Sequence, residues 1–197
     1  MFNKIAFLDL TWGMLGVQLC GFYFLMASFQ QNTNRRIVAH QIGANSLFSV
    51  FYYLCRAYTG SALNALGILR GAIFFFRPNK DGSSWGYKWA DHIIWAYVFC
   101  GLFIAAGIVT WNPPLSLFPT FAMLLNTVGT YCKRPKITRR LALAAQTGWF
   151  AHNLIIFLTE PDGTKMVLAV LTDTFILGSI LVGMWRYDRK RESGKSS

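Results

Sequence analysis

The sequence has few charged residues for its length. Only 14% of its 197 residues are Asp, Glu, Lys or Arg, whereas a soluble domain carries about a quarter. It also lacks a CxxC pair, a Cys/His cluster with metal-ligand spacing, a nucleophile elbow, an HExxH motif and a phosphate-binding glycine loop. The low charge argues against an ordinary soluble domain. Because the motifs of catalytic, metal and phosphate sites are missing, we expect no enzyme activity, no bound metal and no cofactor.

Cysteine is scarce and scattered. Cys20, Cys55, Cys100 and Cys132 each lie alone among apolar residues. An isolated thiol in such a setting behaves as a small hydrophobic side chain. We therefore expect all four cysteines to be small buried hydrophobic residues.

Long apolar runs are abundant, since 54% of the residues are hydrophobic and 16% are aromatic. A membrane-spanning helix needs about 20 apolar residues, or fewer where the bilayer thins locally. Seven segments qualify, so the predicted fold is an all-α polytopic membrane protein. The segments are 10–30, 37–58, 61–76, 92–111, 115–131, 141–158 and 164–187.

The net charge of +11 comes from basic residues in short loops and in the tail. This placement argues against a nucleic-acid partner and predicts contact with anionic lipids at the membrane surface. Fifteen of the nineteen Lys and Arg residues fall on one side of the predicted spans. The positive-inside rule then predicts an N-terminus outside and a C-terminus in the cytoplasm.

The two halves of the chain correspond when it is shifted by 104 residues. Arg35-Arg36 falls on Arg139-Arg140, and the order of helices and turns matches. The shift predicts a triple-helix unit in 1–76, a cytoplasmic loop and linker helix in 77–111, a second unit in 112–187 and a disordered tail in 188–197. Parallel repeats of this kind are typical of transporters, whose site lies between the repeats. A seven-helix bundle without functional symmetry remains the alternative.

Two charged residues lie within predicted spans, Arg70 in the third and Asp173 in the seventh. A charge at membrane depth is costly and needs a partner, a cavity or room to snorkel. Under the 104-residue shift Arg70 falls beside Asp173. The pair would then contact each other or hold opposite ends of a polar ligand, whereas the alternative is that Arg70 snorkels to the nearer interface.

Further polar residues occur in the predicted spans. Trp149 precedes His152 and Asn153 by one helical turn, which places an aromatic ring on the same face as two polar groups. Packing and hydrogen bonding between helices are the alternative roles. Gly67 and Gly71 form a GxxxG motif that predicts close approach of another helix. The other candidates are Asn64 and Asn126, with weaker claims for Asn45 and Gln146.

Several short motifs together resemble the YgjV family of bacterial inner-membrane proteins. They are Leu117-Phe118-Pro119, Cys132-Lys133, Arg139 ten residues before Trp149, the W-x-x-H-N of Trp149, His152 and Asn153, Arg70, and Trp185-Arg186. The resemblance covers most of the chain and implies location in the bacterial inner membrane.

The layout is also similar to the SWEET sugar transporters and the PnuC vitamin-precursor transporters. This architectural resemblance implies a three-plus-one-plus-three arrangement of helices with a substrate between the two bundles. Asn64 lies near one of the two asparagines that SWEET proteins use, but the seventh segment offers Asp173 instead. The proline-glutamine motif of the PQ-loop relatives is absent. The resemblance therefore favours a charged or zwitterionic metabolite over a sugar.

The predicted function is transport of a small polar or zwitterionic metabolite. Arg70 would bind an anionic group, Asp173 a cationic group or a coupling proton, and Trp149 would pack on the substrate. His152, Asn153, Asn64 and Asn126 complete the predicted site. A non-transporting accessory or scaffold subunit is the alternative, and the sequence leaves open whether the chain forms a homo-oligomer.

Overall fold

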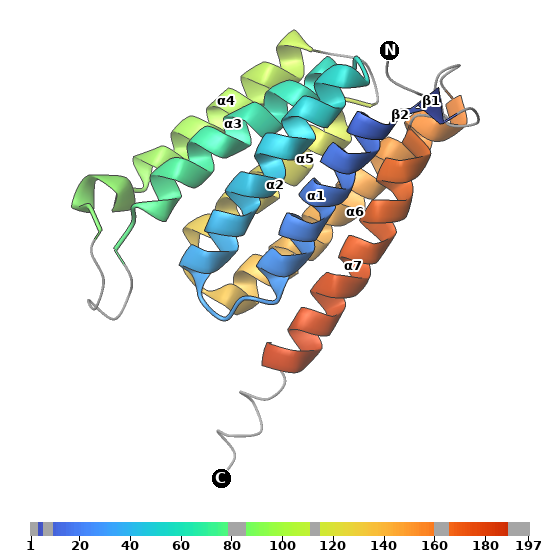
Figure 1. The fold of residues 1–197 in the computed structure, drawn as a ribbon. Coiled ribbons are helices and arrows are strands. Elements are labelled where there is room, and N and C mark those ends of the chain that lie inside the picture. The colour runs from blue at the N-terminus through green and yellow to red at the C-terminus, as the bar shows by residue number, and fades with distance from the viewer. Residues whose placement is uncertain (1–3, 6–9, 79–85, 111–114, 160–165, 189–197) are drawn as a thin grey trace.

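A computed structural model describes residues 4–5, 10–78, 86–110, 115–159 and 166–188. These residues form seven α-helices, one short 3-10 helix and a two-stranded ribbon (Figure 1). The α-helices are α1 Trp12–Phe29, α2 Asn34–Leu54, α3 Tyr58–Phe75, α4 Ile94–Val109, α5 Leu117–Tyr131, α6 Pro135–Thr159 and α7 Val167–Asp188. The 3-10 helix is η1 Lys88–Asp91, and strands β1 Lys4–Ile5 and β2 Leu10–Thr11 pair antiparallel.

Local sequence signals set several helix ends. The Thr11 hydroxyl accepts a hydrogen bond from the Met14 amide and caps α1. Pro135 opens α6 at the position where a missing N–H costs least. Arg56 and Lys133 adopt positive φ angles of 62° and 50° in the turns after α2 and α5. Residues other than glycine rarely adopt positive φ angles, so the chain reverses direction at these two turns through an uncommon backbone conformation.

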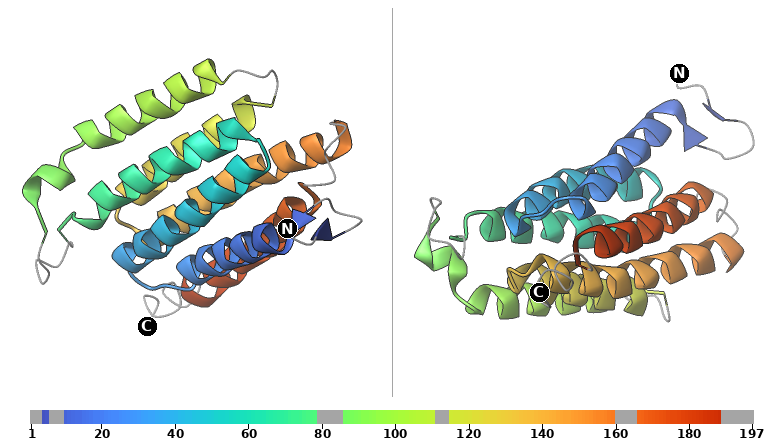
Figure 2. Two further views of the ribbon diagram at one scale, coloured as in Figure 1. Left: turned by 45° about the horizontal axis from the view of Figure 1, so that its top comes forward. Right: turned by 90° about the horizontal axis from the view of Figure 1, so that it is seen from below.

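The helices form two layers of three (Figure 2). Helices α1, α2 and α3 pack in sequence order, and α5, α6 and α7 do the same. The layers meet where α1 packs against α7 and where α3 packs against α5, while α4 covers α3 and α5 from outside. Helices α2 and α6 are therefore the middle members of the layers, with the interior of the bundle between them.

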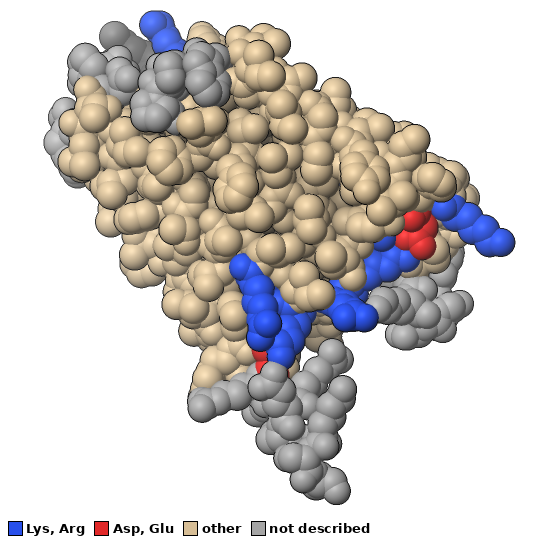
Figure 3. Space-filling view, turned by 180° about the vertical axis from the view of Figure 1, so that it is seen from behind, with Lys and Arg blue, Asp and Glu red and all other residues tan. Residues whose placement is uncertain are grey.

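Basic residues gather at one end of the bundle (Figure 3). The α1–α2, α3–α4 and α5–α6 connections and the end of α7 lie at this end, hereafter the basic end. Because α4 returns the chain to the opposite end, α5 starts at the same end as α1. By their positions in the chain, the described basic residues at this end are Arg35, Arg36, Arg77, Lys88, Lys133, Arg134, Lys136, Arg139, Arg140 and Arg186.

The outer faces of the helices are apolar as well as the core. Phe51, Leu63 and Phe103 are fully buried, whereas Val109 is 85% exposed and Trp185 is 67% exposed. By length and composition, α1, α6 and α7 are long and apolar enough to cross a membrane. Large apolar side chains pointing outward are what a lipid environment requires. The architecture is that of a helical membrane protein.

The structure corrects two local expectations. Helix α6 begins at Pro135 rather than at residue 141, so Arg139 lies in a helix and is only 1% exposed. Lys and Arg are good helix formers, which is why a basic run expected to be a loop continues the helix. The cysteines are not buried: Cys20 is exposed and the other three are half-buried. Apolar side chains of a membrane protein face lipid as readily as the core. Of the predicted disordered tail, only Asp188 lies within the described residues.

Candidate functional site

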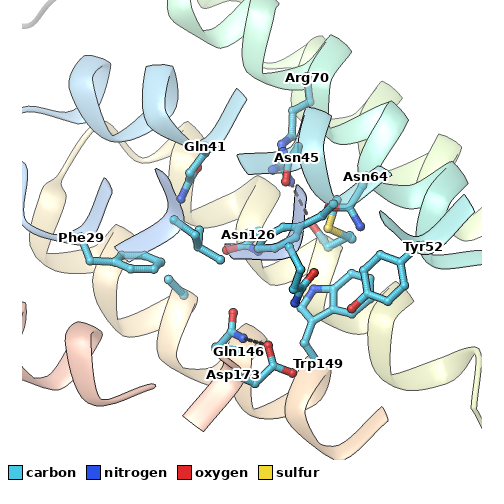
Figure 4. Close-up of a pocket in the computed structure, with 15 residues that line it drawn as sticks. Phe29, Gln41, Asn45, Tyr52, Asn64, Arg70, Asn126, Gln146, Trp149 and Asp173 are labelled. Atoms are coloured by element: carbon cyan, nitrogen blue, oxygen red, sulfur yellow. Dashed lines mark hydrogen bonds between the residues drawn. The ribbon is translucent and has the colours of Figure 1, made fainter. Parts of the chain in front are cut away.

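A cavity lies between the two layers (Figure 4). Its lining comes from α1, α2, α3, α5, α6 and α7. The volume open to the centres of water molecules is about 50 Å³. A buried water needs roughly 10–15 Å³ on this measure, so the cavity holds a few waters in this conformation.

Arg70 lies beside the cavity near the end of α3 and is 3% exposed. Its Nη1 donates to Thr127 Oγ1 at 3.0 Å and to the Met123 carbonyl at 3.3 Å, both on α5. The guanidinium also lies 5.5 Å from the centre of the Phe103 ring. Among the described residues no carboxylate pairs with Arg70, so its charge lies next to the cavity with only neutral partners.

Asp173 lies on another side of the cavity, near the start of α7. Its Oδ1 accepts a hydrogen bond from Gln146 Nε2 at 2.6 Å, and its Oδ2 accepts one from Asn153 Nδ2 at 2.8 Å. Both donors are neutral amides. Arg70 and Asp173 are well separated in Figure 4 and form no ion pair. Both α3 and α7 run toward the basic end, so the cation lies nearer that end and the anion nearer the other.

Asn153 connects Asp173 to the opposite layer. It is fully buried on α6, and its Nδ2 also donates to the Tyr52 hydroxyl of α2 at 3.1 Å. The Tyr52 hydroxyl in turn donates to Asn153 Oδ1 at 3.3 Å. The Tyr52 ring stacks on Trp149, with ring centres 5.7 Å apart and planes at 27°. This group therefore joins the two middle helices along one wall of the cavity.

Three carboxamide side chains face the cavity without a hydrogen bond to any described residue. They are Gln41 and Asn45 on α2 and Asn126 on α5. Polar groups inside a protein are normally hydrogen-bonded, so such amides are available to water or to a ligand. Asn64 also lines the cavity, but its Nδ2 donates to the Gly60 carbonyl at 2.8 Å.

The glycines of the GxxxG motif explain how α2 comes so close to α3. A Cβ atom on Gly67 would lie 2.7 Å from Asn45 Nδ2, and one on Gly71 would lie 2.6 Å from Ile42 Cγ1. The predicted packing role of this motif is confirmed. Its consequence for the site is that the Asn45 amide occupies the space left by Gly67, beside Arg70.

The structure brings most of the predicted site residues together. Arg70, Asp173, Trp149, Asn64 and Asn126 line the cavity, and Asn153 holds Asp173 from just behind it. His152 does not line this cavity. It is 4% exposed, its Nδ1 bonds the Leu115 carbonyl at 2.9 Å, and it lines a separate hollow beside the α3 start. The binding roles of all seven residues stay predictions.

Sequence reasoning missed several polar residues. Gln18 and Gln41 line the cavity, and each is a polar residue within an apolar run, the same signal that identified Arg70. Tyr52 carried no signal, because it lies in a run of aromatic residues that all look alike. Arg77 and Arg139 were expected in loops facing lipid headgroups, yet they are 6% and 1% exposed.

Outward apolar faces around a buried polar cavity define a helical membrane protein. The Imp-YgjV family model, described as a bacterial inner membrane protein, matches residues 14–191. The chain therefore belongs to the YgjV family of bacterial inner membrane proteins, which confirms the predicted resemblance. No curated protein and no solved structure matches the chain.

Proposed function

We propose that this inner membrane protein transports a small polar or zwitterionic metabolite through the cavity between its two helical layers. The single observation that supports this most is the combination of Arg70 with three amides that have no hydrogen bond to a described residue. Leaving polar groups unsatisfied at membrane depth is costly, so their presence around one cavity favours a polar ligand.

The proposal includes seven membrane-crossing helices arranged as three, one and three. Helices α1–α3 and α5–α7 would be parallel repeats, with α4 as the linker, because both sets run in the same direction and pack in the same order. Helix α5 has 15 residues and is about 22 Å long, so the bilayer would have to thin around it. The positive-inside rule places the basic end and the C-terminus in the cytoplasm and the N-terminus outside.

The proposed binding mode follows from the charges. Arg70 would bind an anionic group of the substrate, and Asp173 would bind a cationic group or a coupling proton. Asn126, Asn64 and the amides of α2 would hydrogen-bond the part between. The present cavity holds only a few waters, so the layers must move apart to admit a metabolite. Rocking of one repeat against the other is how such transporters admit substrate from alternate sides.

The alternative is a non-transporting accessory or scaffold subunit. It predicts a dry bundle in which Arg70 snorkels to the headgroups. The guanidinium instead bonds Thr127 and the Met123 carbonyl inside the bundle, which supports transport over the alternative. We further propose that exposed basic residues such as Arg36 and Arg140 contact anionic lipids. We also propose that the protein catalyses no reaction.

Flux into vesicles tests the proposal. The purified protein is reconstituted and given a panel of radiolabelled zwitterions, small anions and sugars. We expect flux of a zwitterion or anion that falls by about tenfold or more in Arg70→Ala and Asp173→Asn, because each loses a charged contact with the substrate. Arg140→Ala removes an exposed arginine and serves as the control. Equal flux in all four proteins would eliminate the proposed site.

A further inference from the structure

Two buried arginines at the basic end each bind the last carbonyls of a helix in the opposite layer. Arg77, which follows α3, donates from Nη1 to the Tyr131 carbonyl at 2.9 Å and to the Thr130 carbonyl at 3.4 Å, at the end of α5. Arg139 of α6 donates to the Phe29 carbonyl at 3.2 Å and to the Gln31 carbonyl at 2.8 Å, at the end of α1. The last carbonyls of a helix lack intrahelical partners, and a cation there also complements the helix dipole.

Each arginine is also held by a carboxylate and covers a tyrosine ring. Arg77 pairs with Asp91 of η1 at 2.9 Å, and its guanidinium lies 4.3 Å from the centre of the Tyr131 ring. Arg139 pairs with Asp188 of α7 at 2.8 Å and lies 5.0 Å from the centre of the Tyr187 ring. We name these the Arg77 cluster (Arg77, Asp91, Tyr131) and the Arg139 cluster (Arg139, Asp188, Tyr187).

The two clusters lie on opposite sides of the basic end, because one joins α3 to α5 and the other joins α6 and α7 to α1. Between them Thr138 of α6 donates to Asn34 of α2 at 3.3 Å. Within the Arg139 cluster, Tyr187 also donates across the interface, to the Gln30 carbonyl at 3.0 Å. Polar contacts thus cross the layer interface over the whole width of the basic end.

Among the described residues, the cross-layer hydrogen bonds nearer the other end are neutral. Tyr52 bonds Asn153, and Gln18 Nε2 donates to Thr172 Oγ1 at 3.0 Å. Hydrogen bonds to a charged group are roughly twice as strong as neutral ones. Counting only contacts between residues that the structure describes, the layers are therefore held together more strongly at the basic end than at the opposite end.

We propose that the Arg77 and Arg139 clusters form a double latch that closes the cavity toward the basic end and must release before the cavity opens there. The inference concerns how the cavity is regulated and rests on the proposed function. Each latch crosses between layers that must separate, so both arginines have to leave their helix-end carbonyls for this end to open. The acids hold the arginines in place, and removing them weakens the latch without removing the arginine.

A cysteine at position 142 can report whether the double latch is open, because its labelling measures access to the cavity. Ala142 lines the cavity, is 3% exposed and lies one turn after Arg139. The test uses Ala142→Cys in a chain whose four native cysteines are replaced. Labelling by a membrane-impermeant maleimide is measured from each side of oriented vesicles, in the parent and in Asp91→Asn with Asp188→Asn. The control is Arg140→Gln, which removes an exposed charge adjacent to Arg139.

We expect the double variant to label about tenfold faster from the basic side, with no change from the other side, as expected from losing charge-assisted contacts. The control should label at the parent rate. An unchanged rate from the basic side, or an equal increase from both sides, would overturn the latch. Because labelling needs no substrate, a failure of the latch is distinguishable from a failure to find transport.

A locking experiment covers the case in which the double variant does not fold. Asn34→Cys and Thr138→Cys place a thiol pair across the interface at the centre of the basic end. The pair is bridged with a short bis-maleimide in the chain whose four native cysteines are replaced and which keeps Ala142. The bridge should abolish the transport found for the unbridged protein and leave substrate binding from the opposite side intact. Full transport by the bridged protein would overturn the latch.

Discussion

Thr138 donates a hydrogen bond to Asn34 at 3.3 Å, and the two residues are separated by 104 positions. This is the same shift that aligns the two halves of the sequence. In a structure with two-fold repeats, only residues beside the symmetry axis can touch their own counterparts. The contact is therefore consistent with the proposed repeat, whose axis would then pass between the start of α2 and the start of α6.

Substitutions at two glycines of α7 test how closely α1 packs against this helix. A Cβ atom on Gly183 would lie 2.7 Å from the Phe29 carbonyl oxygen, a backbone atom, while one on Gly178 would meet nothing within 4 Å. We expect Gly183→Ala to lower the free energy of unfolding by about 1–3 kcal/mol through overpacking. Gly178→Ala should be neutral or stabilising by up to about 1 kcal/mol, since alanine favours helix. Reversible unfolding in detergent measures both, and equal effects would contradict the α1–α7 packing.

Tyr52 tests the link between the middle helices. Tyr52→Phe removes the hydroxyl that bonds Asn153 from across the interface. We expect a loss of about 0.5–1.5 kcal/mol in the free energy of unfolding, the usual value of one hydrogen bond. Tyr53→Phe is the matched control, because Tyr53 is 63% exposed. If the two variants are equally stable, the Tyr52–Asn153 bond does not hold the layers together.

His152 and Asn153 are neighbours with separable roles. Because a carbonyl only accepts, His152 Nδ1 carries the proton that bonds Leu115. We expect His152→Ala to cost about 1–3 kcal/mol of stability by leaving this buried carbonyl unsatisfied, with substrate affinity unchanged. Asn153→Ala should weaken substrate binding as well, because it releases Asp173. Thermal unfolding and ligand binding, measured on the same samples of both variants, separate the effect on stability from the effect on substrate affinity. A loss of affinity in His152→Ala would show that His152 takes part in substrate binding.

Asp91 makes the Arg77 cluster sensitive to acid. Partial burial raises the pKa of the Asp91 carboxyl, but hydrogen bonds and charges from Lys133 and Arg77 outweigh it and hold the pKa below its usual value. A carboxyl with a lowered folded-state pKa stabilises the fold above its unfolded pKa of about 3.9. That stabilisation is lost as the pH falls through the folded-state pKa.

Thermal unfolding measured as a function of pH tests this. The wild type should lose more stability than Asp91→Asn below about pH 4, and the difference between the curves should vanish in strong acid. Other carboxyls titrate in both proteins, so only the difference reports on Asp91. Parallel curves throughout would show that the Arg77–Asp91 pair contributes nothing to the folded state.

Much of the architecture could be predicted from sequence. Apolar length and loop chemistry located seven helices, and Pro135 is the one strong start signal that was overlooked. The site was harder to predict. Arg70 and Asp173 stand out because charge is rare in apolar runs, whereas Tyr52 lies among similar aromatic residues and has no distinguishing neighbour. Its partner Asn153 is 101 positions away, beyond the reach of any local pattern.

Arg139 and Arg140 show the difference between what the sequence predicts and what the tertiary structure decides. The sequence by itself determined that both lie at the basic end, because apolar length sets the helices and clustered charge marks their ends. Only the tertiary structure decided that Arg139 is buried against α1 and Asp188 while Arg140 is exposed. Successive helical residues point about 100° apart, and which direction is inward depends on where α1 and α7 pack.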